Sequence, residues 1–286
     1  MKSLNWKLWS CLLAIIFPLS EAVTDHERDV ERRRMRKQLG LYSDFAAAIS
    51  TGELVEIENR LDGQREELVD MYFLGYGLTH LMFAVYIDDN VEIVRKLLHA
   101  GWDVNFRAEL TGETALIVAA KFKRTETLKE LLREQWHVSV NVVDEKGRSA
   151  LMYSVHCSYK CECEADAENI RLLLTHGADP FQVHEPSGKN ALMMSLDANA
   201  TLAEVKTIVG YVIETGTLED RRCMIDHQDK DGRTPLMLAA ELNRSDLFVY
   251  LVKFGEADIK IKDEEGLTAA DYLHRQGVKI DDCKSF

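Results

Sequence analysis

The sequence predicts an all-α solenoid of about six to seven helix pairs. Three observations support this fold class: a glycine-centred motif recurs six times, an apolar segment with helical spacing follows five of the motifs, and the composition is that of a folded chain. The chain has 286 residues, of which 46% are hydrophobic and 29% charged, which excludes a disordered chain and a membrane bundle.

The first 22 residues have the pattern of a secretory signal peptide. Lys2 and Lys7 precede an apolar run over residues 8–19, and Ser20 and Ala22 are the small residues that precede a cleavage site. The run is shorter than the roughly 20 apolar residues that span a bilayer. We expect cleavage after Ala22; an uncleaved anchor and a buried N-terminal helix are the alternatives.

A charged leader over residues 23–41 follows the predicted signal peptide. Its basic part, residues 28–37, is interleaved with acidic side chains, which is typical of a solvated helix or a flexible segment. A proprotein cleavage site around residues 32–37 and a targeting or anionic-surface patch are the alternatives.

Six turn glycines, separated by 35, 35, 41, 44 and 34 residues, mark the repeats: Gly77, Gly112, Gly147, Gly188, Gly232 and Gly266. With a degenerate unit before them, the expected solenoid covers residues 42–276, and its units lie near 42–74, 75–109, 110–144, 145–185, 186–229, 230–263 and, in part, 264–276. Residues 277–286 form a C-terminal tail. One unit cannot bury its apolar face alone, so stacking of neighbours has to supply the core.

Each unit reads as a turn, a capped first helix and a second helix. The glycine permits a turn with positive φ. Two residues later stands a good N-cap residue: Thr79, Thr114, Ser149, Asn190, Thr234 or Thr268. Pro235 occupies the first helical position, where its missing N–H costs nothing. Apolar spacing then predicts the second helices over residues 91–99, 127–133, 168–176, 202–214 and 245–254.

The motifs at residues 232–240 (GRTPLMLAA) and 77–84 (GLTHLMFA) resemble the Gly-x-Thr-Pro-Leu-His-x-Ala-Ala pattern of the ankyrin repeat family. The resemblance covers about residues 42–276. It implies helix pairs stacked in an L-shaped solenoid, with β-hairpin fingers that project from one edge.

The chain departs from the family pattern in two respects. Methionine takes the usual place of the motif's histidine at four positions, which puts the hydrogen bonds of that histidine in question: Met82, Met152, Met193 and Met237. Insertions also break the period, one between paired helices around residues 157–165 and one that lengthens a finger over 216–229. We expect both insertions to be exposed loops.

Five cysteines lie beyond the predicted signal peptide: Cys157, Cys161, Cys163, Cys223 and Cys283. In an oxidising compartment, a disulfide from Cys157 to Cys161 or Cys163 is the expected pairing. Zinc binding and unpaired thiols are the alternatives, although the spacing is not that of a common zinc module. An odd number leaves one thiol free or intermolecular, so we expect Cys223 or Cys283 to be able to join two chains.

Two N-glycosylation sequons begin at Asn199 and Asn243, both expected at turns between paired helices. Motifs for a nucleophile elbow, a phosphate loop or a zinc protease are absent from the sequence. Asp144, Asp229 and Asp263 precede turn glycines and are explained as turn formers. We therefore expect no enzyme activity, no metal and no cofactor.

Binding of a protein is the expected function. In ankyrin repeat proteins, partners usually meet the finger tips and the exposed part of the first helix. Carried over by position, the partner-binding residues are Tyr86, Lys121, Phe122, Arg148, Lys189, Arg233, Glu241 and Leu242. Nucleic acid is not expected as a partner, because a net charge of −13 repels phosphate backbones.

Trp102 and Trp136 stand 34 residues apart, where the family usually has alanine, and are expected to stack in adjacent units. They either fill space behind the fingers or form an exposed aromatic ridge that adds to the partner-binding surface. Together these features predict a non-enzymatic scaffold in the secretory pathway or outside the cell, such as a secreted effector, without stable membrane insertion. The alternative is a membrane-anchored or intracellular adaptor that keeps its N-terminal segment.

Overall fold

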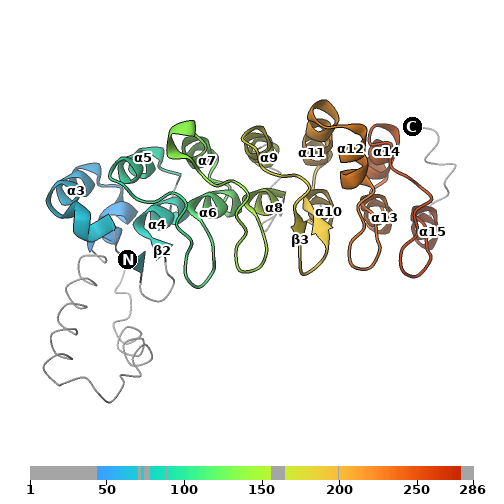
Figure 1. Cartoon of the computed structure of the whole chain (residues 1–286), viewed down its shortest axis with the longest axis horizontal. Coiled ribbons are helices and arrows are strands. Elements are labelled where there is room, and N and C mark those ends of the chain that lie inside the picture. Colours follow the sequence, from blue (N-terminus) through green and yellow to red (C-terminus); the bar gives the residue numbers. More distant parts are fainter. Residues whose placement is uncertain are drawn as a thin grey trace, which may run out of the picture.

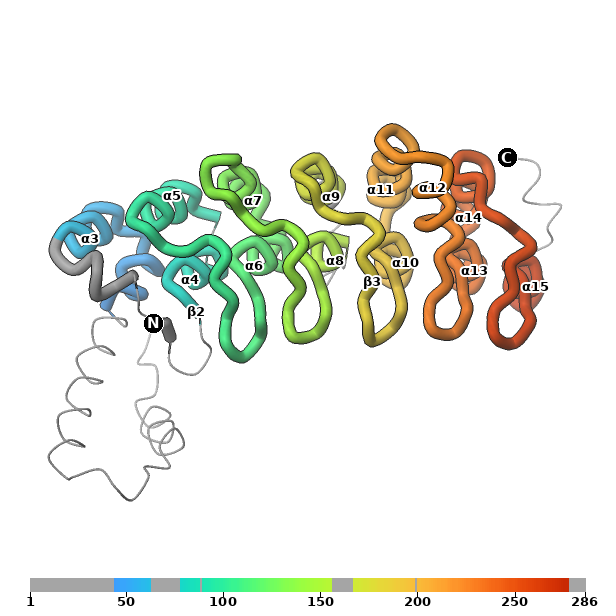
Figure 2. Tube along the Cα trace, viewed as in Figure 1, coloured from blue at the N-terminus to red at the C-terminus, as the bar shows by residue number. Residues whose placement is uncertain are grey.

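The structure is a computed structural model that describes residues 44–69, 72–73, 78–87, 89–155, 165–198 and 200–277. The described residues form an elongated stack of helix pairs in two rows (Figure 1). We call the lower row of Figure 1 the inner helices and the upper row the outer helices. The loops that join one pair to the next extend below the inner helices as fingers (Figure 2).

The inner helices are α4 (His80–Ile87), α6 (Ala115–Lys121), α8 (Ala150–Val155), α10 (Ala191–Asp197), α13 (Pro235–Glu241) and α15 (Ala269–Arg275). The outer helices are α3 (Leu54–Val69), α5 (Val91–His99), α7 (Thr125–Leu131), α9 (Ala165–Thr175), α11 (Leu202–Thr215) and α14 (Ser245–Lys253). Residues 44–51 are also helical. From α4 onward, each inner helix contacts the next inner helix, and most also contact the outer helix of their own pair. Stacking thus supplies the core, as predicted.

The predicted N-caps start the inner helices. The side chains of Thr114, Asn190 and Thr234 accept the backbone N–H three residues later, at 3.3, 3.0 and 3.3 Å. Met237 completes one cap, because its Sδ accepts the Thr234 N–H at 3.5 Å. At the last repeat the arrangement changes, since the Thr268 hydroxyl donates to the Asp271 carboxylate at 2.7 Å.

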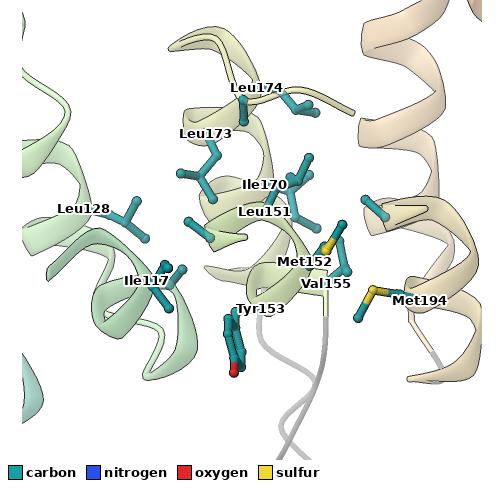
Figure 3. Packing of buried hydrophobic residues seen from close by; sticks show 14 of the residues in the cluster. Ile117, Leu128, Leu151, Met152, Tyr153, Val155, Ile170, Leu173, Leu174 and Met194 are labelled. Atoms are coloured by element: carbon teal, nitrogen blue, oxygen red, sulfur yellow. The ribbon is translucent and has the colours of Figure 1, made fainter. Parts of the chain in front are cut away.

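The core lies between the rows and is continuous along the stack. Around α8, Leu151, Met152 and Val155 lie between α6, α9 and α10 (Figure 3). The four methionines that replace the family's histidine are all 0–1% exposed, so they fill core volume: Met82, Met152, Met193 and Met237. Burying each such side chain contributes about 1.5–3 kcal/mol.

The fingers contain little strand. Two have paired two-residue strands, β1 (Tyr72–Phe73) with β2 (Leu78–Thr79) and β3 (Val183–His184) with β4 (Lys189–Asn190). In another finger, the only pairing is an isolated bridge between Val143 and Ser149. The described fingers are therefore mostly turns, held by other hydrogen bonds.

Neighbouring fingers are joined through their backbones. The N–H two residues before one turn glycine donates to the carbonyl just before the preceding turn glycine: Glu145 to Thr111 at 2.9 Å, Lys230 to Ser187 at 3.2 Å and Glu264 to Asp231 at 3.2 Å. Pro186 holds this donor position in another finger and has no N–H. There the His184 ring replaces it, because Nε2 donates to the Lys146 carbonyl at 3.0 Å.

The insertion over residues 216–229 is not the exposed loop that the sequence predicted. Residues Leu218–Ile225 form helix α12, which Thr217 caps by accepting the Asp220 N–H at 3.2 Å. Met224 and Ile225 are buried at its C-terminal end and join the core. The capping pair and the two apolar anchors explain why this segment folds as a helix. The other insertion, around residues 157–165, lies almost entirely outside the described residues.

Helices long and apolar enough to cross a membrane are absent from the described part of the chain. The expected signal peptide, residues 1–22, and the leader, residues 23–41, lie outside that part.

Candidate protein-binding surface

The surface that collects most of the predicted partner-binding residues is formed by the fingers and the C-terminal ends of the inner helices. We call it the inner face. It has two kinds of position: the residue after each turn glycine, and the residue eight positions later at the end of the inner helix. Both belong to one repeat and are connected by its inner helix, and the finger turns lie below the inner helices (Figure 2).

Ion pairs join these two positions in three repeats: Glu113 with Lys121 at 2.6 Å, Lys189 with Asp197 at 2.6 Å and Arg233 with Glu241 at 3.4 Å. Four of these six residues are at least partly buried, which limits screening by solvent. The inner face therefore carries a row of charges that are mostly neutralised within their own repeat.

Arg233 is the most completely paired cation of this row. Its guanidinium contacts Asp229 at 3.2 Å and Asp231 at 2.8 Å, in addition to Glu241. Burial lowers the pKa of Arg233, but these three carboxylates outweigh burial and hold the pKa above its ordinary value. This cation is satisfied inside the protein.

The turn aspartates behave as predicted. Oδ1 of Asp144 accepts two backbone N–H groups of its own turn, from Lys146 and Arg148, both at 2.9 Å. Equivalent bonds form at Asp229 and Asp263. These carboxylates hold the finger turns, which leaves no reason to assign them a catalytic role.

Tyr153 joins its turn aspartate to two cations of the inner face. The buried phenol donates to Asp144 Oδ2 at 2.6 Å, and its ring lies below α8, away from α9 (Figure 3). Lys121 Nζ and Arg148 Cζ lie 5.5 and 5.7 Å from the ring centroid. Burial and then the hydrogen bond to Asp144 raise the pKa of Tyr153 far above its ordinary value, so the phenol stays a donor.

An apolar patch lies at the N-terminal end of the inner face. Tyr86 is 49% exposed and meets the half-buried Phe122 edge-on, with ring centroids 4.8 Å apart. The Lys121 ammonium lies 5.7 Å from the Phe122 ring, which places this patch beside Tyr153 and Arg148. Leu242, 47% exposed, is a separate apolar position at the end of α13.

The two tryptophans lie away from the inner face, and of the two alternatives predicted for them Trp102 takes the filling of space. Trp102 is 4% exposed and packs on Phe45, with ring centroids 6.0 Å apart, so it fills space and forms no exposed ridge. Trp136 is half-buried by the outer helices, where its indole N–H donates to Glu130 at 3.4 Å and its ring meets His99 edge-on. None of the ring contacts of the described residues joins the two tryptophans.

A second exposed apolar group lies at the outer helices and was missed by the sequence reasoning. Phe254, 61% exposed, stacks on Tyr250 with ring centroids 5.3 Å apart. Leu218 on α12 is 65% exposed. Only the unusual placement of a phenylalanine at the end of the predicted helix over residues 245–254 hinted at this group.

The predicted modification sites are only partly described. Cys223 is an exposed free cysteine, and it lies on α12 and not on a finger. Asn243 is exposed at the turn between α13 and α14, with φ of 54°. The remaining positions lie outside the described residues, so their disulfides and glycan stay predictions: Cys157, Cys161, Cys163, Cys283 and Asn199.

Comparison with known proteins gives a consistent result. A family profile described as ankyrin repeats, in three copies, matches residues 81–180 and 161–263. Neurogenic locus notch homolog protein 1 of Danio rerio is 27% identical over 182 residues, which cover 62% of this chain and 6% of that protein. The nuclear factor NF-kappa-B p105 subunit of Gallus gallus is 27% identical over 232 residues, which cover 79% of this chain and 21% of that protein.

Among solved structures, the ankyrin repeat domain of Bcl-3, described as a unique member of the IkappaB protein family, has the same fold. Its TM-score is 0.66 at 23% sequence identity, and the match covers 80% of this chain and 92% of that one. The matched regions span only 6% and 21% of the two curated relatives' own length.

Proposed function

This chain belongs to the ankyrin repeat family, and from this premise we propose that it is a non-enzymatic scaffold that binds a protein partner on its inner face. Ankyrin repeats generally act as interaction modules without catalysis. The observation that carries the proposal is the contact between the exposed Tyr86 and the half-buried Phe122, which two adjacent repeats present together.

The position of this pair is what makes it informative. Single exposed apolar residues are ordinary on protein surfaces. Tyr86 and Phe122, however, come from different repeats and touch one another, and a stable stack does not need either aromatic ring to face solvent. Aromatic side chains dominate the binding energy of protein interfaces, because covering them removes a large apolar area from water. The pair is therefore a suitable anchor for a partner.

Site-specific photo-crosslinking in the native source tests the proposal. A benzophenone amino acid at Tyr86 is expected to form a covalent adduct with a protein partner after irradiation. The matched control places the same probe at Lys129 on outer helix α7, where the side chain is 42% exposed. An adduct at Lys129 and none at Tyr86 would move the binding surface to the outer helices and contradict the proposal.

We also propose that the protein acts in the secretory pathway or outside the cell, since residues 1–22 carry a signal-peptide pattern. The intact mass of the natural protein, with and without reductant, tests this. The expected result is a chain that begins at Val23, with about two daltons lost for each disulfide. A full-length chain with reduced thiols would favour the anchored or intracellular adaptor instead.

A further inference from the structure

Arg148 differs from every other cation that follows a turn glycine in the described repeats. We propose that the protein partner of the inner face is an acidic peptide segment, with an Asp or Glu carboxylate bound by Arg148 and a neighbouring apolar side chain on the Tyr86–Phe122 pair. This inference rests on the proposed function and adds the chemistry of the partner.

The comparison with Arg233 shows what Arg148 lacks. Both residues follow a turn glycine, and Arg233 contacts three carboxylates: Asp229, Asp231 and Glu241. At Arg148 none of the three equivalent positions supplies a carboxylate oxygen. Tyr153 already occupies Oδ2 of the turn aspartate, and sequence position 146 is a lysine. The third position, 156, is a histidine that lies outside the described residues.

Arg148 is therefore a cation without an internal counter-ion among the described residues. Its guanidinium is held beside the Tyr153 ring, 5.7 Å from the centroid. A carboxylate brought by another molecule would supply the counter-ion that Arg148 lacks. Arginine binds carboxylates through two parallel N–H donors, which suits this position.

The surrounding charges favour an acidic segment over a neutral one. The ammonium of Lys146 forms no ion pair with any described residue and adds a second positive charge at the same finger. Lys121 is paired with Glu113, and Glu145 lies 3.9 Å from Arg107. Asp144 and Glu145 equal Lys146 and Arg148 in number, but the Asp144 carboxylate is occupied by the Tyr153 hydroxyl and by N–H groups of its own turn. Lys146 and Arg148 are thus two adjacent cations without an ion pair among the described residues, which suits an acidic partner.

The aromatic pair and the arginine belong to one continuous surface. From the Phe122 ring, the Lys121 ammonium lies at 5.7 Å, and the same ammonium lies 5.5 Å from the Tyr153 ring that Arg148 flanks. An extended peptide rises about 3.3 Å per residue, so a few residues are enough to contact both the Phe122 ring and the Arg148 guanidinium. The expected ligand is thus a carboxylate and an apolar side chain close together in sequence.

Selection of a phage-displayed library of random 12-residue peptides on the full-length protein tests the inference. The expected outcome is enrichment of Asp or Glu near Leu, Ile or an aromatic residue. A selected peptide is then labelled and its affinity measured by fluorescence anisotropy. Arg148→Gln is expected to weaken peptide binding about 10- to 100-fold, because one charge-assisted hydrogen bond is lost. The affinity of the wild-type protein for the same peptide is expected to fall as the salt concentration rises.

Two further variants isolate the counter-ion argument. Lys146→Asp recreates at Arg148 the contact that Asp231 makes with Arg233 at 2.8 Å, so it should abolish the acidic preference while the arginine remains. Lys230→Asp makes the same charge change on another finger and is expected to leave binding within about twofold. Circular dichroism establishes that each variant is folded.

The outcomes separate this inference from the proposed function. Peptides that lose binding with Tyr86→Ala but not with Arg148→Gln would keep the inner face as the binding surface and overturn its acidic partner. Peptides that bind both variants with wild-type affinity would count against the proposed function itself. A selection without enriched peptides would overturn the inference. A single-stranded oligonucleotide bound through Arg148, or a dimer of the chain that Arg148→Gln dissolves, would assign the surface to another occupant.

Discussion

Replacing Gly188 with alanine is expected to destabilise the solenoid more than the same change at Gly177. Both glycines have positive φ, 72° and 87°, so each alanine adds about 1–2 kcal/mol of backbone strain. At Gly188 the new Cβ would also lie 2.8 Å from the backbone nitrogen of Lys230, whereas at Gly177 it would have nothing within 4 Å. That nitrogen donates to Ser187 in the neighbouring finger, a bond that contributes about 0.5–1.5 kcal/mol.

Thermal unfolding followed by circular dichroism measures this difference. For about 200 residues, each kcal/mol shifts Tm by about 2–4 °C, so Gly188→Ala is expected to melt about 1–6 °C below Gly177→Ala. Gly232→Ala serves as a replicate, since its Cβ would lie 2.9 Å from the Glu264 nitrogen. Equal melting temperatures for all three variants would refute the idea that close contact between fingers, and not φ alone, requires glycine.

Three other predictions follow from the structure. Burial raises the pKa of Glu130, but hydrogen bonds from Arg95 and Trp136 hold it below its ordinary value, so its stabilising effect is present at neutral pH and lost at low pH. In urea titrations, the stability lost by Glu130→Gln should therefore shrink below about pH 4. Thr217→Ala removes the N-cap of α12 and should cost about 1 kcal/mol in the same assay, whereas Thr217→Ser should not. A non-reducing gel is expected to show a dimer that Cys223→Ser removes; monomer alone would contradict linkage through this exposed thiol.

The helix pairs could be predicted because each depends on local signals. The second helix over residues 91–99 was predicted with the bounds that α5 has, since Asn90 caps it and apolar residues recur along one face. The segment over residues 216–229 carried a similar signal in Thr217 and Asp220, a capping pair three residues apart. It was predicted as a loop because the repeat period left no place for a further helix.

The binding surface could be predicted only as a set of positions. The resemblance to the family assigned Arg148 and Arg233 to the same kind of partner-binding position, because both follow a turn glycine. The difference between them depends on Tyr153, whose hydroxyl takes Oδ2 of Asp144. The same bond forms between Tyr272 and Asp263 at the same spacing of nine residues, so a tyrosine nine residues after a turn aspartate is a signal that the sequence carried. Sequence could not decide between the two alternatives for Trp102, since the ring that covers it belongs to Phe45 of another repeat.

The replacement of one backbone donor by the His184 ring has a mechanical consequence. Three other pairs of described fingers are joined by peptide groups, but between the fourth and fifth units the bond to Lys146 runs through a side chain with two torsions. Pro186 removes the backbone donor, so at this joint the connection between the fingers depends on the rotamer of one side chain. The aromatic pair and Arg233 lie on opposite sides of this joint, so a substitution at His184 would remove this link between the two parts of the inner face without removing a peptide N–H.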